Sequence, residues 1–359
     1  MKTLAVLFAA VPLVATPVLT ERPRLAIAGL VHSHVWGHLE RMAKMTDADL
    51  VGIAEPNQEL IGEAKKAAPN AAYFADYKEM IEAKKPHIVW AFVENNRHLE
   101  IVEYCAPRKI HVIFEKPLAS TYKDALKIRD LARKHDIQVM TNYQMAWWAT
   151  QYAAKAEAEK GSIGEVWRLR GVVGHGGPGS EGARSKYFFD WLTDPVKNGA
   201  GALMDFGCYN ALWSLWYLGR PESVFATTNR LQTSRFPKVE DNAVLVLHYK
   251  NGVGIFEGSW DLPRSFQDLE VFGRTGSVYM TQRGVELRAG RGGASEVKAA
   301  PLAPDRAEPV GYLIARLKEG KPVDGLVALD INLQVNEIIE AALQSLKTGK
   351  PQPLPPAAR

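Results

Sequence analysis

The segment His111-Val-Ile-Phe-Glu-Lys-Pro117 carries the strongest architectural signal in this chain. Its first four residues form a short apolar run that predicts a buried strand, and an acid, a base and a rigid turn residue follow at once. Ligands of open α/β sheets bind at the edge where such strands end, outside their carboxyl ends. A desolvated Lys116 would there have a lowered pKa and serve as a proton donor or acceptor near neutral pH. The alternative is that Lys116 is a solvated loop lysine.

Apolar runs of the same kind alternate with helical patterns through the first part of the chain. Strand-like runs occur at 25–28, 50–54, 88–93, 111–114 and 138–141. Strands that alternate with helices of about 10–15 residues indicate parallel βαβ units and a doubly wound sheet. We therefore expect an α/β domain over residues 22–142.

The pattern changes after Trp148. A helix over 149–160 and a strand over 164–173 precede a Gly-rich loop at 174–182, and a further helix is predicted over 202–218. Strand-like runs then follow at 223–231, 243–249, 254–260, 269–272 and 277–280. Turn signals such as Asn251-Gly252 indicate antiparallel pairing. Residues 143–359 should thus form an α+β domain with an open, mainly antiparallel sheet, and helices at 310–319 and 330–347 can pack back on the first domain.

Length and composition limit the classes of function. With 359 residues the chain can bury a large core in two domains, and its net charge of +4 comes without any basic run. Nucleic-acid binding is therefore not expected. Cys105 and Cys208 are far apart and lack metal-site spacing, so neither a disulfide framework nor a zinc site is predicted from them.

The first 20 residues have the layout of a signal peptide. Lys2 precedes an apolar stretch over 4–15 that is too short to span a bilayer, and Thr16-Pro17 break it. Cleavage is expected between Ala15 and Glu21, with export to a periplasm or the cell exterior. The alternatives are a disordered tail, a membrane-anchoring tail and, with either, a cytoplasmic protein.

The turn after the first predicted strand is an altered dinucleotide motif. A Gly-x-Gly-x-x-Gly turn would cradle a pyrophosphate, but the segment here is Gly29-Leu-Val-His-Ser-His34. Gly29 keeps the tight turn, whereas Val31 and His34 replace the other two glycines. Together with His32 and Ser33, these residues are the candidates for cofactor binding through this turn.

Two further features bear on the ligand of this turn. Glu55, at the end of the second strand, is placed to bind adenosine ribose hydroxyls and would repel a 2′-phosphate, which favours NAD over NADP; alternatively it caps the next helix. His32, His34 and His38 crowd the turn, but we expect no carboxylate or cysteine nearby to complete a metal site. We expect no metal there, and contacts to cofactor phosphates, to substrate or within the core instead.

At this point the chain resembles the Gfo/Idh/MocA family of oxidoreductases. The resemblance rests on the order and spacing of several motifs: the Gly29 turn, Asp76-Tyr77, Asn95 with His98, Glu115-Lys116-Pro117, the segment 201–209, Glu240-Asp241-Asn242 and Thr348-Gly349-Lys350-Pro351. It implies an N-terminal Rossmann domain that binds NAD(P), with Asn95, His98 and Glu115 beside the cofactor. It also implies a C-terminal sheet with one face over the substrate and the other in a homo-oligomer, a dimer or tetramer.

The resemblance also implies roles for three residues. The lysine matching Lys116 is catalytic in the family, and the aspartate matching Asp205 binds substrate hydroxyls. The position of Tyr209 is usually a histidine that transfers a proton. Asp205 and Tyr209 are four residues apart on one predicted helix and can face one cleft.

The chemistry of Tyr209 can be argued directly. A free phenol titrates near ~10, and a nearby Lys116 ammonium should lower that pKa, so that the pair takes a hydroxyl proton. The alternative for Tyr209 is packing beside Trp213 and Trp216. Trp147 is a candidate for stacking on a sugar or for core packing, and His175 in the Gly-rich loop is a candidate for orienting substrate or an ordinary loop residue.

Three functions follow from these observations. The first is an NAD-linked enzyme that oxidises or reduces a hydroxyl or carbonyl of a sugar, polyol or related small molecule. The second, implied by the resemblance because some exported members of the family act in this way, is an exported glycoside hydrolase or lyase. Such an enzyme holds its NAD tightly and regenerates it in each cycle, because little free NAD exists outside the cytoplasm. The third is a sugar-binding protein without turnover, for which Val31 in the turn is the main support.

Overall fold

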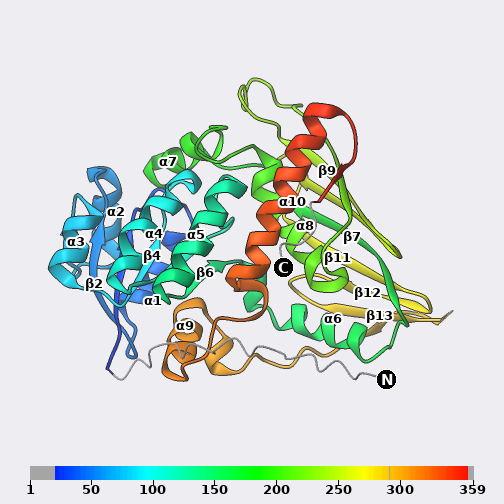
Figure 1. Cartoon of the computed structure of the whole chain (residues 1–359), viewed down its shortest axis with the longest axis horizontal. Coiled ribbons are helices and arrows are strands. Elements are labelled where there is room, and N and C mark those ends of the chain that lie inside the picture. Colours follow the sequence, from blue (N-terminus) through cyan, green and yellow to red (C-terminus); the bar gives the residue numbers. More distant parts are fainter. Residues whose placement is uncertain (1–20, 291, 355–359) are drawn as a thin grey trace, which may run out of the picture.

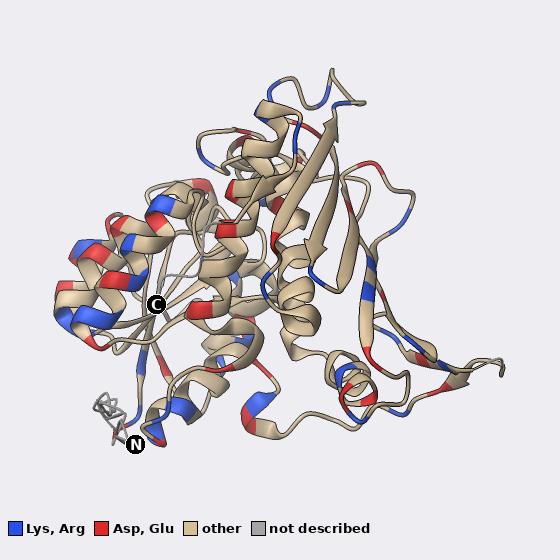
Figure 2. Cartoon of the chain, turned by 45° about the vertical axis from the view of Figure 1, so that its right-hand side comes forward, with Lys and Arg blue, Asp and Glu red and all other residues tan. Residues whose placement is uncertain are grey.

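Two sheets lie side by side in the computed structural model, which describes residues 21–290 and 292–354 (Figure 1). The predicted signal peptide at residues 1–20 lies outside the described residues. Within the described ranges, no helix combines the length and apolar character needed to cross a bilayer. Lys/Arg and Asp/Glu residues are interspersed along the outer helices of the first domain (Figure 2).

The first sheet is parallel, as predicted, with strand order β3-β2-β1-β4-β5-β6. Its strands are β1 (Arg24–Ala28), β2 (Asp49–Ala54), β3 (Tyr73–Phe74), β4 (Ile88–Ala91), β5 (His111–Glu115) and β6 (Val139–Asn142). The chain order reverses between β1 and β4, and a crevice for ligands opens at the carboxyl ends of strands at such a reversal. The Gly29 turn and the Glu115-Lys116 segment both lie at this edge.

Helices cover both faces of this sheet: α1 (Val35–Ala43), α2 (Gln58–Ala67), α3 (Tyr77–Lys84), α4 (His98–Cys105) and α5 (Tyr122–His135), with short 3₁₀ turns η1 (Asn95–Arg97) and η2 (Ala106–Arg108). Three of these helices begin at a side-chain cap, which satisfies N–H groups that have no partner inside the helix. Asn57 accepts from the N–H of Glu59, Asp76 from two N–H groups in α3, and Thr121 from α5.

The second sheet has strand order β14-β13-β12-β11-β7-β10-β9-β8-β15. Its strands are β7 (Val166–Gly174), β8 (Ser223–Asn229), β9 (Asn242–Tyr249), β10 (Gly252–Ser259), β11 (Phe266–Gly273), β12 (Gly276–Met280), β13 (Val285–Ala289), β14 (Ser295–Glu296) and β15 (Gln352–Pro353). Pairing is antiparallel except between β7 and β10. The predicted open, mainly antiparallel sheet is therefore confirmed, with one parallel pair at its centre.

The helical elements of the second half are η3 (Gln144–Trp147), α6 (Ala149–Glu159), α7 (Gly182–Leu192), α8 (Ala202–Leu218), η4 (Pro304–Arg306), α9 (Pro309–Lys318), η5 (Gly325–Val327) and α10 (Leu329–Thr348). The first four turns of α8 are buried on all sides, because the helix packs between the second sheet and α10. In β9, Ala243, Leu245 and Leu247 are buried on the α8 side, whereas Val244 and Val246 remain half-exposed on the other face.

The C-terminal helices return to the first domain. The Asn336 side chain on α10 donates to the Ala119 carbonyl at 2.7 Å, and the Val323 N–H donates to the Gln138 side chain at 2.9 Å. In Figure 1, α10 runs along the boundary of the two sheets and α9 lies beneath the first one. These contacts agree with the expectation that the C-terminal segment packs back on the first domain.

The helix α7 is the main element that the sequence patterns do not predict. Its residues alternate between exposed and half-buried over most of its length, so it lacks the continuous apolar stripe of a core helix. The Gly-rich loop predicted at 174–182 is present and leads into it.

Two glycine substitutions should change stability in opposite directions. Gly29 has a φ of +82°, and a Cβ there would lie 2.5 Å from Val93 Cγ1, so Gly29→Ala should cost about 1–3 kcal/mol of unfolding free energy. Gly62 lies on the exposed side of α2 with no neighbour within 4 Å, so Gly62→Ala should gain about 0.5–1 kcal/mol. Urea unfolding of both variants measures the difference, and a Gly29→Ala protein as stable as Gly62→Ala would contradict the turn geometry.

Candidate active site

A buried ion pair joins the two domains at the carboxyl edge of the first sheet. The Lys116 ammonium contacts the Asp205 carboxylate and donates to the Asp205 backbone carbonyl at 2.9 Å. The second carboxylate oxygen of Asp205 accepts from Trp260 Nε1 at 2.7 Å. All three side chains are buried. The end of β5, the first turn of α8 and the residue after β10 thus converge on one point.

The ion pair keeps both partners charged. Burial disfavours the Lys116 ammonium, but the Asp205 carboxylate more than offsets this and raises the pKa of Lys116. Burial likewise disfavours the Asp205 carboxylate, but Lys116 and the Trp260 N–H hold its pKa below the usual range. The prediction of a lowered Lys116 pKa is therefore wrong for this state, because desolvation is outweighed by a carboxylate in direct contact.

Tyr209 lies next to this pair, as its spacing from Asp205 predicts. Lys116 Nζ is 5.2 Å from the centre of the Tyr209 ring, and Tyr143 packs edge-on against that ring at 5.1 Å. Burial raises the pKa of Tyr209 despite the opposing effect of Lys116. The expectation of a lowered phenol pKa is thus also wrong here: the ammonium lies over the ring, and the phenol has lost its water.

Glu115 belongs to a buried hydrogen-bond network. One of its carboxylate oxygens lies 2.7 Å from His34 Nδ1, and the other accepts from Asn142 at the end of β6 at 2.8 Å. The Asn142 side-chain oxygen in turn accepts from Trp147 Nε1 at 2.7 Å. Burial opposes the Glu115 charge, but the neighbouring His34 keeps the pKa of Glu115 below its ordinary value. Trp147 is therefore anchored through its indole N–H, with its ring 5.7 Å from Tyr312.

The Glu55 carboxylate fixes the Gly29 turn. Its two oxygens accept from the N–H of Leu30 at 2.6 Å and from the N–H of Asn57 at 2.9 Å. Burial raises the pKa of Glu55, although these two N–H donors act in the opposite direction. The carboxylate therefore joins the turn to the start of α2.

Of the four backbone N–H groups at positions 31–34, two are engaged within the protein and two are available to an anionic group such as a pyrophosphate. The N–H of His32 donates to the Phe92 carbonyl at 3.0 Å, and the N–H of His34 faces His32 Nδ1 at 3.3 Å. The N–H groups of Val31 and Ser33 have no partner in the part of the chain that the structure describes. They lie just before α1, where a helix N-terminus favours a phosphate.

The unpredicted helix α7 covers this turn from the second domain. Trp191 Nε1 donates to the Val31 carbonyl at 3.1 Å, and the Tyr187 hydroxyl donates to Glu59 on α2 at 2.8 Å. Phe188 and Trp191 also pack against the His32 ring, with ring centres 5.1 and 5.5 Å away. A ligand held by the turn would therefore be enclosed by both domains.

Two of the three histidines, His32 and His34, lie together in the turn, whereas His38 lies in α1 in a different environment. His32 is buried and lies close to His34, and both rings approach Glu115: one ligand atom from each of the three residues lies within 4.8 Å of the others. The expectation that no carboxylate accompanies these histidines is wrong, because Glu115 is distant in sequence. His38 instead packs on Trp90 at 4.7 Å, and burial lowers its pKa to about 4.

The remaining predicted residues lie around this centre. Asn95 donates to the Asn198 side chain at 2.8 Å, which ties η1 to the loop before α8. His98 stacks on Phe114 at 4.2 Å and sits in the core, where burial lowers its pKa to about 4. His175 packs against Phe206, and burial lowers its pKa, with smaller effects from Asp205 and Lys116. The structure thus brings His175 to the ion pair and gives Asn95 and His98 contacts within the protein.

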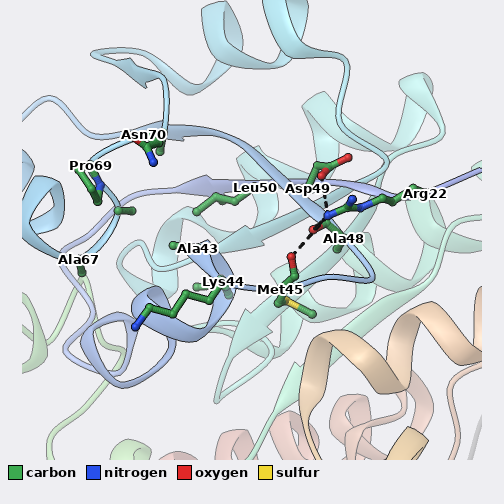
Figure 3. Close-up of a pocket in the computed structure, with 13 residues that line it drawn as sticks. Arg22, Ala43, Lys44, Met45, Ala48, Asp49, Leu50, Ala67, Pro69 and Asn70 are labelled. Carbon is green, nitrogen blue, oxygen red and sulfur yellow. Dashed lines mark hydrogen bonds and ion pairs between the residues drawn. The ribbon is translucent and has the colours of Figure 1, made fainter.

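Several site residues have no motif of their own in the sequence. Trp260, Asn142 and Trp191 hold Asp205, Glu115 and the Val31 carbonyl through side-chain N–H groups. Trp260 and Asn142 lie at or just after strand ends on the ligand edge, which is the only signal that could have identified them. A hollow elsewhere, lined by Arg22, residues 42–45 and 48–50 and residues 67–71, lies at the opposite ends of β1 and β2 (Figure 3).

Known proteins share both halves of this architecture. Residues 23–143 match the oxidoreductase family with an NAD-binding Rossmann fold, and residues 152–279 match the Gfo/Idh/MocA C-terminal domain. Myo-inositol 2-dehydrogenase of Thermotoga maritima is 26% identical over 247 residues, which are 67% of this chain and 70% of that protein. Levoglucosan dehydrogenase of Pseudarthrobacter phenanthrenivorans is 26% identical over 260 residues, so this chain matches less than two thirds, 63%, of its length.

A solved structure of a levoglucosan dehydrogenase in complex with NADH and levoglucosan has the same fold. It superposes with a TM-score of 0.77 at 20% identity, and the alignment covers 93% of this chain and 100% of that one. Both domain matches, in the expected order, agree with the parallel and mixed sheets described above. The chain belongs to the Gfo/Idh/MocA family of NAD(P)-dependent oxidoreductases.

Proposed function

We propose that this protein oxidises or reduces a hydroxyl or carbonyl group of a sugar or polyol. The observation that carries the proposal is the buried Lys116–Asp205 pair with Tyr209 against it, at the sheet edge next to the Gly29 turn. The names of the relatives, an inositol and a levoglucosan dehydrogenase, support a polyhydroxylated substrate. NAD, when bound, supplies the hydride acceptor or donor.

The turn residues would hold the cofactor. The free N–H groups of Val31 and Ser33 suit the pyrophosphate, and Gly29 keeps the turn that presents them. Glu55 lies where the adenosine ribose would approach, and its carboxylate disfavours the extra phosphate of NADP. Because Val31 only adds bulk to the side chain, its backbone N–H remains able to bind an oxygen.

Lys116 and Tyr209 would transfer the proton to or from the substrate oxygen. In the described state the ammonium is charged and the phenol is protonated, which suits donation to a carbonyl oxygen. In the oxidative direction, a substrate hydroxyl that enters the ion pair would take over a contact of Asp205. Lys116 would then be free to stabilise a Tyr209 phenolate, which accepts the proton. Asp205, His175 and Trp147 would orient the sugar.

The enclosure by α7 favours a second candidate, an exported glycoside hydrolase or lyase with a recycled cofactor. Trp191 and Phe188 cover the turn, so release of a nucleotide would require α7 to leave the turn and α2. Retention of this kind is what an enzyme needs where free NAD is scarce, and the predicted signal peptide would place it there. Oxidation of a ring hydroxyl would acidify a neighbouring C–H, elimination and water addition would follow, and the hydride would return to the sugar.

The open face of the second sheet is proposed to form a homo-oligomer interface. Phe225, Val246 and Ile255 are neighbours in register on that face, and each is only half-buried in the isolated chain. A continuous apolar strip on a sheet face favours association with a second copy. A dimer or tetramer would cover it.

Bound nucleotide should be found in the purified protein. Acid release followed by mass spectrometry is expected to show NAD. In Trp191→Ala the NAD should dissociate about tenfold faster, because the lost contacts would remove roughly 1.4 kcal/mol of binding free energy. Trp167→Ala, on β7 and away from the turn, is the matched control. If protein free of nucleotide also takes up no added NAD, the proposed function fails. NADH that accumulates with product supports a simple dehydrogenase, whereas hydrolysis without NADH supports the recycled cofactor.

The pH dependence should reveal the proton carrier. Because the Tyr209 pKa is raised, the oxidation rate should climb with pH through neutrality into the alkaline range, whereas carbonyl reduction, which uses the protonated phenol, should stay flat. Tyr209→Phe and Lys116→Met should each lower kcat/KM by about 10²–10⁴-fold. Tyr143→Phe, which removes a neighbouring hydroxyl, is the control. An oxidation profile that levels off at neutral pH, or unchanged turnover in Lys116→Met, would contradict the assignment.

Disrupting the open face should change the oligomeric state. Val246→Arg places a charge at the centre of the apolar strip and should shift the protein to monomers in analytical ultracentrifugation. Leu231→Arg, at a residue that is 65% exposed and outside the sheet, should leave the mass unchanged. A monomeric wild-type protein at micromolar concentration would refute the proposed interface.

A further inference from the structure

We propose that His32, His34 and Glu115 form a binding site for a divalent transition-metal ion, with Zn²⁺ as the best fit. Each residue offers one ligand atom, and the three atoms lie within 4.8 Å of one another. Two ligands of one tetrahedral Zn²⁺ are about 3.4 Å apart, given Zn–N and Zn–O distances of about 2.0–2.2 Å. Small side-chain rotations therefore suffice to bring all three atoms onto one ion.

The fold, and not local sequence, assembles these ligands. His32 and His34 lie in the turn between β1 and α1, whereas Glu115 ends β5, and β4 separates the two strands in the sheet. Two imidazoles and one carboxylate are a set that Zn²⁺ accepts, and the same set serves other divalent ions such as Fe²⁺. Within residues 21–290 and 292–354, no further His, Cys, Asp or Glu joins the group.

A second layer of hydrogen bonds orients the carboxylate. Asn142 donates to one oxygen of Glu115 at 2.8 Å and is itself held by Trp147, so the other oxygen is directed at His34 Nδ1, 2.7 Å away. Outer partners of this kind orient the ligands of metal sites and raise their affinity. In the absence of a metal, the direct contact between His34 and Glu115 satisfies both groups, which explains how the site stays ordered.

The site has an entry path and an open coordination position. Glu115 and His32 are buried, but the His34 side chain is 31% exposed, so an ion can approach from its side. Three protein ligands leave a position for water or a substrate hydroxyl, as in zinc sites that take part in chemistry. With two neutral imidazoles and one carboxylate, a bound Zn²⁺ leaves one net positive charge. Glu115 directly precedes Lys116, so this charge would lie beside the proposed substrate site.

Metal loading of the full chain tests the proposal. Wild-type protein incubated with Zn²⁺ and desalted should retain about one equivalent by elemental analysis, as a three-ligand site predicts. His34→Ala and Glu115→Gln should weaken Zn²⁺ binding by more than about 100-fold, beyond the loss expected for an outer partner, and Asn142→Ala by about 10–100-fold. His38→Ala, in α1 just after the turn but with its ring on Trp90, is the matched control and should bind as wild type. X-ray absorption should show nitrogen and oxygen neighbours only.

Several results would overturn the site. These are a wild-type chain that retains no zinc, variants of His34 and Glu115 that bind as tightly as His38→Ala, or a sulfur neighbour in the absorption spectrum. Thermal melts of each variant separate lost ligation from lost folding. Glu115→Gln helps in this separation, because its side-chain oxygen can still accept the hydrogen bond from Asn142 while the carboxylate charge is removed. Nucleotide content measured in the same samples keeps the two proposals apart: nucleotide without zinc rejects only the metal site, and zinc without nucleotide rejects only the hydride-transfer function.

Discussion

The contact between Lys116 and Asp205 is the constraint on which the rest of the site depends. It buries two opposite charges at the junction of the domains, and neither can be left alone there without a large desolvation cost. The Asp205 pKa is lowered, so its contribution to stability is present above its unfolded value and is lost as pH falls through the folded value. The Lys116 pKa is raised, so its contribution is present below its unfolded value and is lost only as pH rises through the folded value. The pair therefore holds the domains together across the neutral range, and a substrate hydroxyl has to compete with it.

This competition links stability to specificity. Asp205 is already satisfied by the ammonium and by Trp260, so a ligand with a single hydroxyl gains little by entering. A polyol can replace the contacts of Asp205 and at the same time offer donors and acceptors to His175. The way the site satisfies its own charges therefore fits the polyhydroxylated substrate proposed above.

The sequence patterns predict the architecture around the site but not the pKa values of its residues. Alternating strands and helices predict the parallel sheet, and the four-residue spacing of Asp205 and Tyr209 predicts that they lie together beside Lys116, because both depend on local periodicity. The raised pKa values of Lys116 and Tyr209 depend on how completely tertiary packing removes water, which no local pattern encodes. The same holds for the grouping of Glu115 with His32 and His34, since these residues come from strands that are not adjacent. The helix α7 escaped prediction because its contacts are to another domain.

The departures from the usual glycine turn are coupled to one another. A glycine at position 34 would permit close helix packing but would leave Glu115 without its imidazole partner at 2.7 Å. The Val31 carbonyl, in turn, is held by Trp191 from α7, and the same helix packs on His32. The His34 and His32 side chains thus each contact a group that a glycine could not engage. Reverting His34 to glycine would remove the contact with Glu115, whereas a glycine at position 31 would keep the backbone carbonyl that Trp191 binds, so the coupling of this turn to Glu115 and to α7 depends on the two histidine side chains.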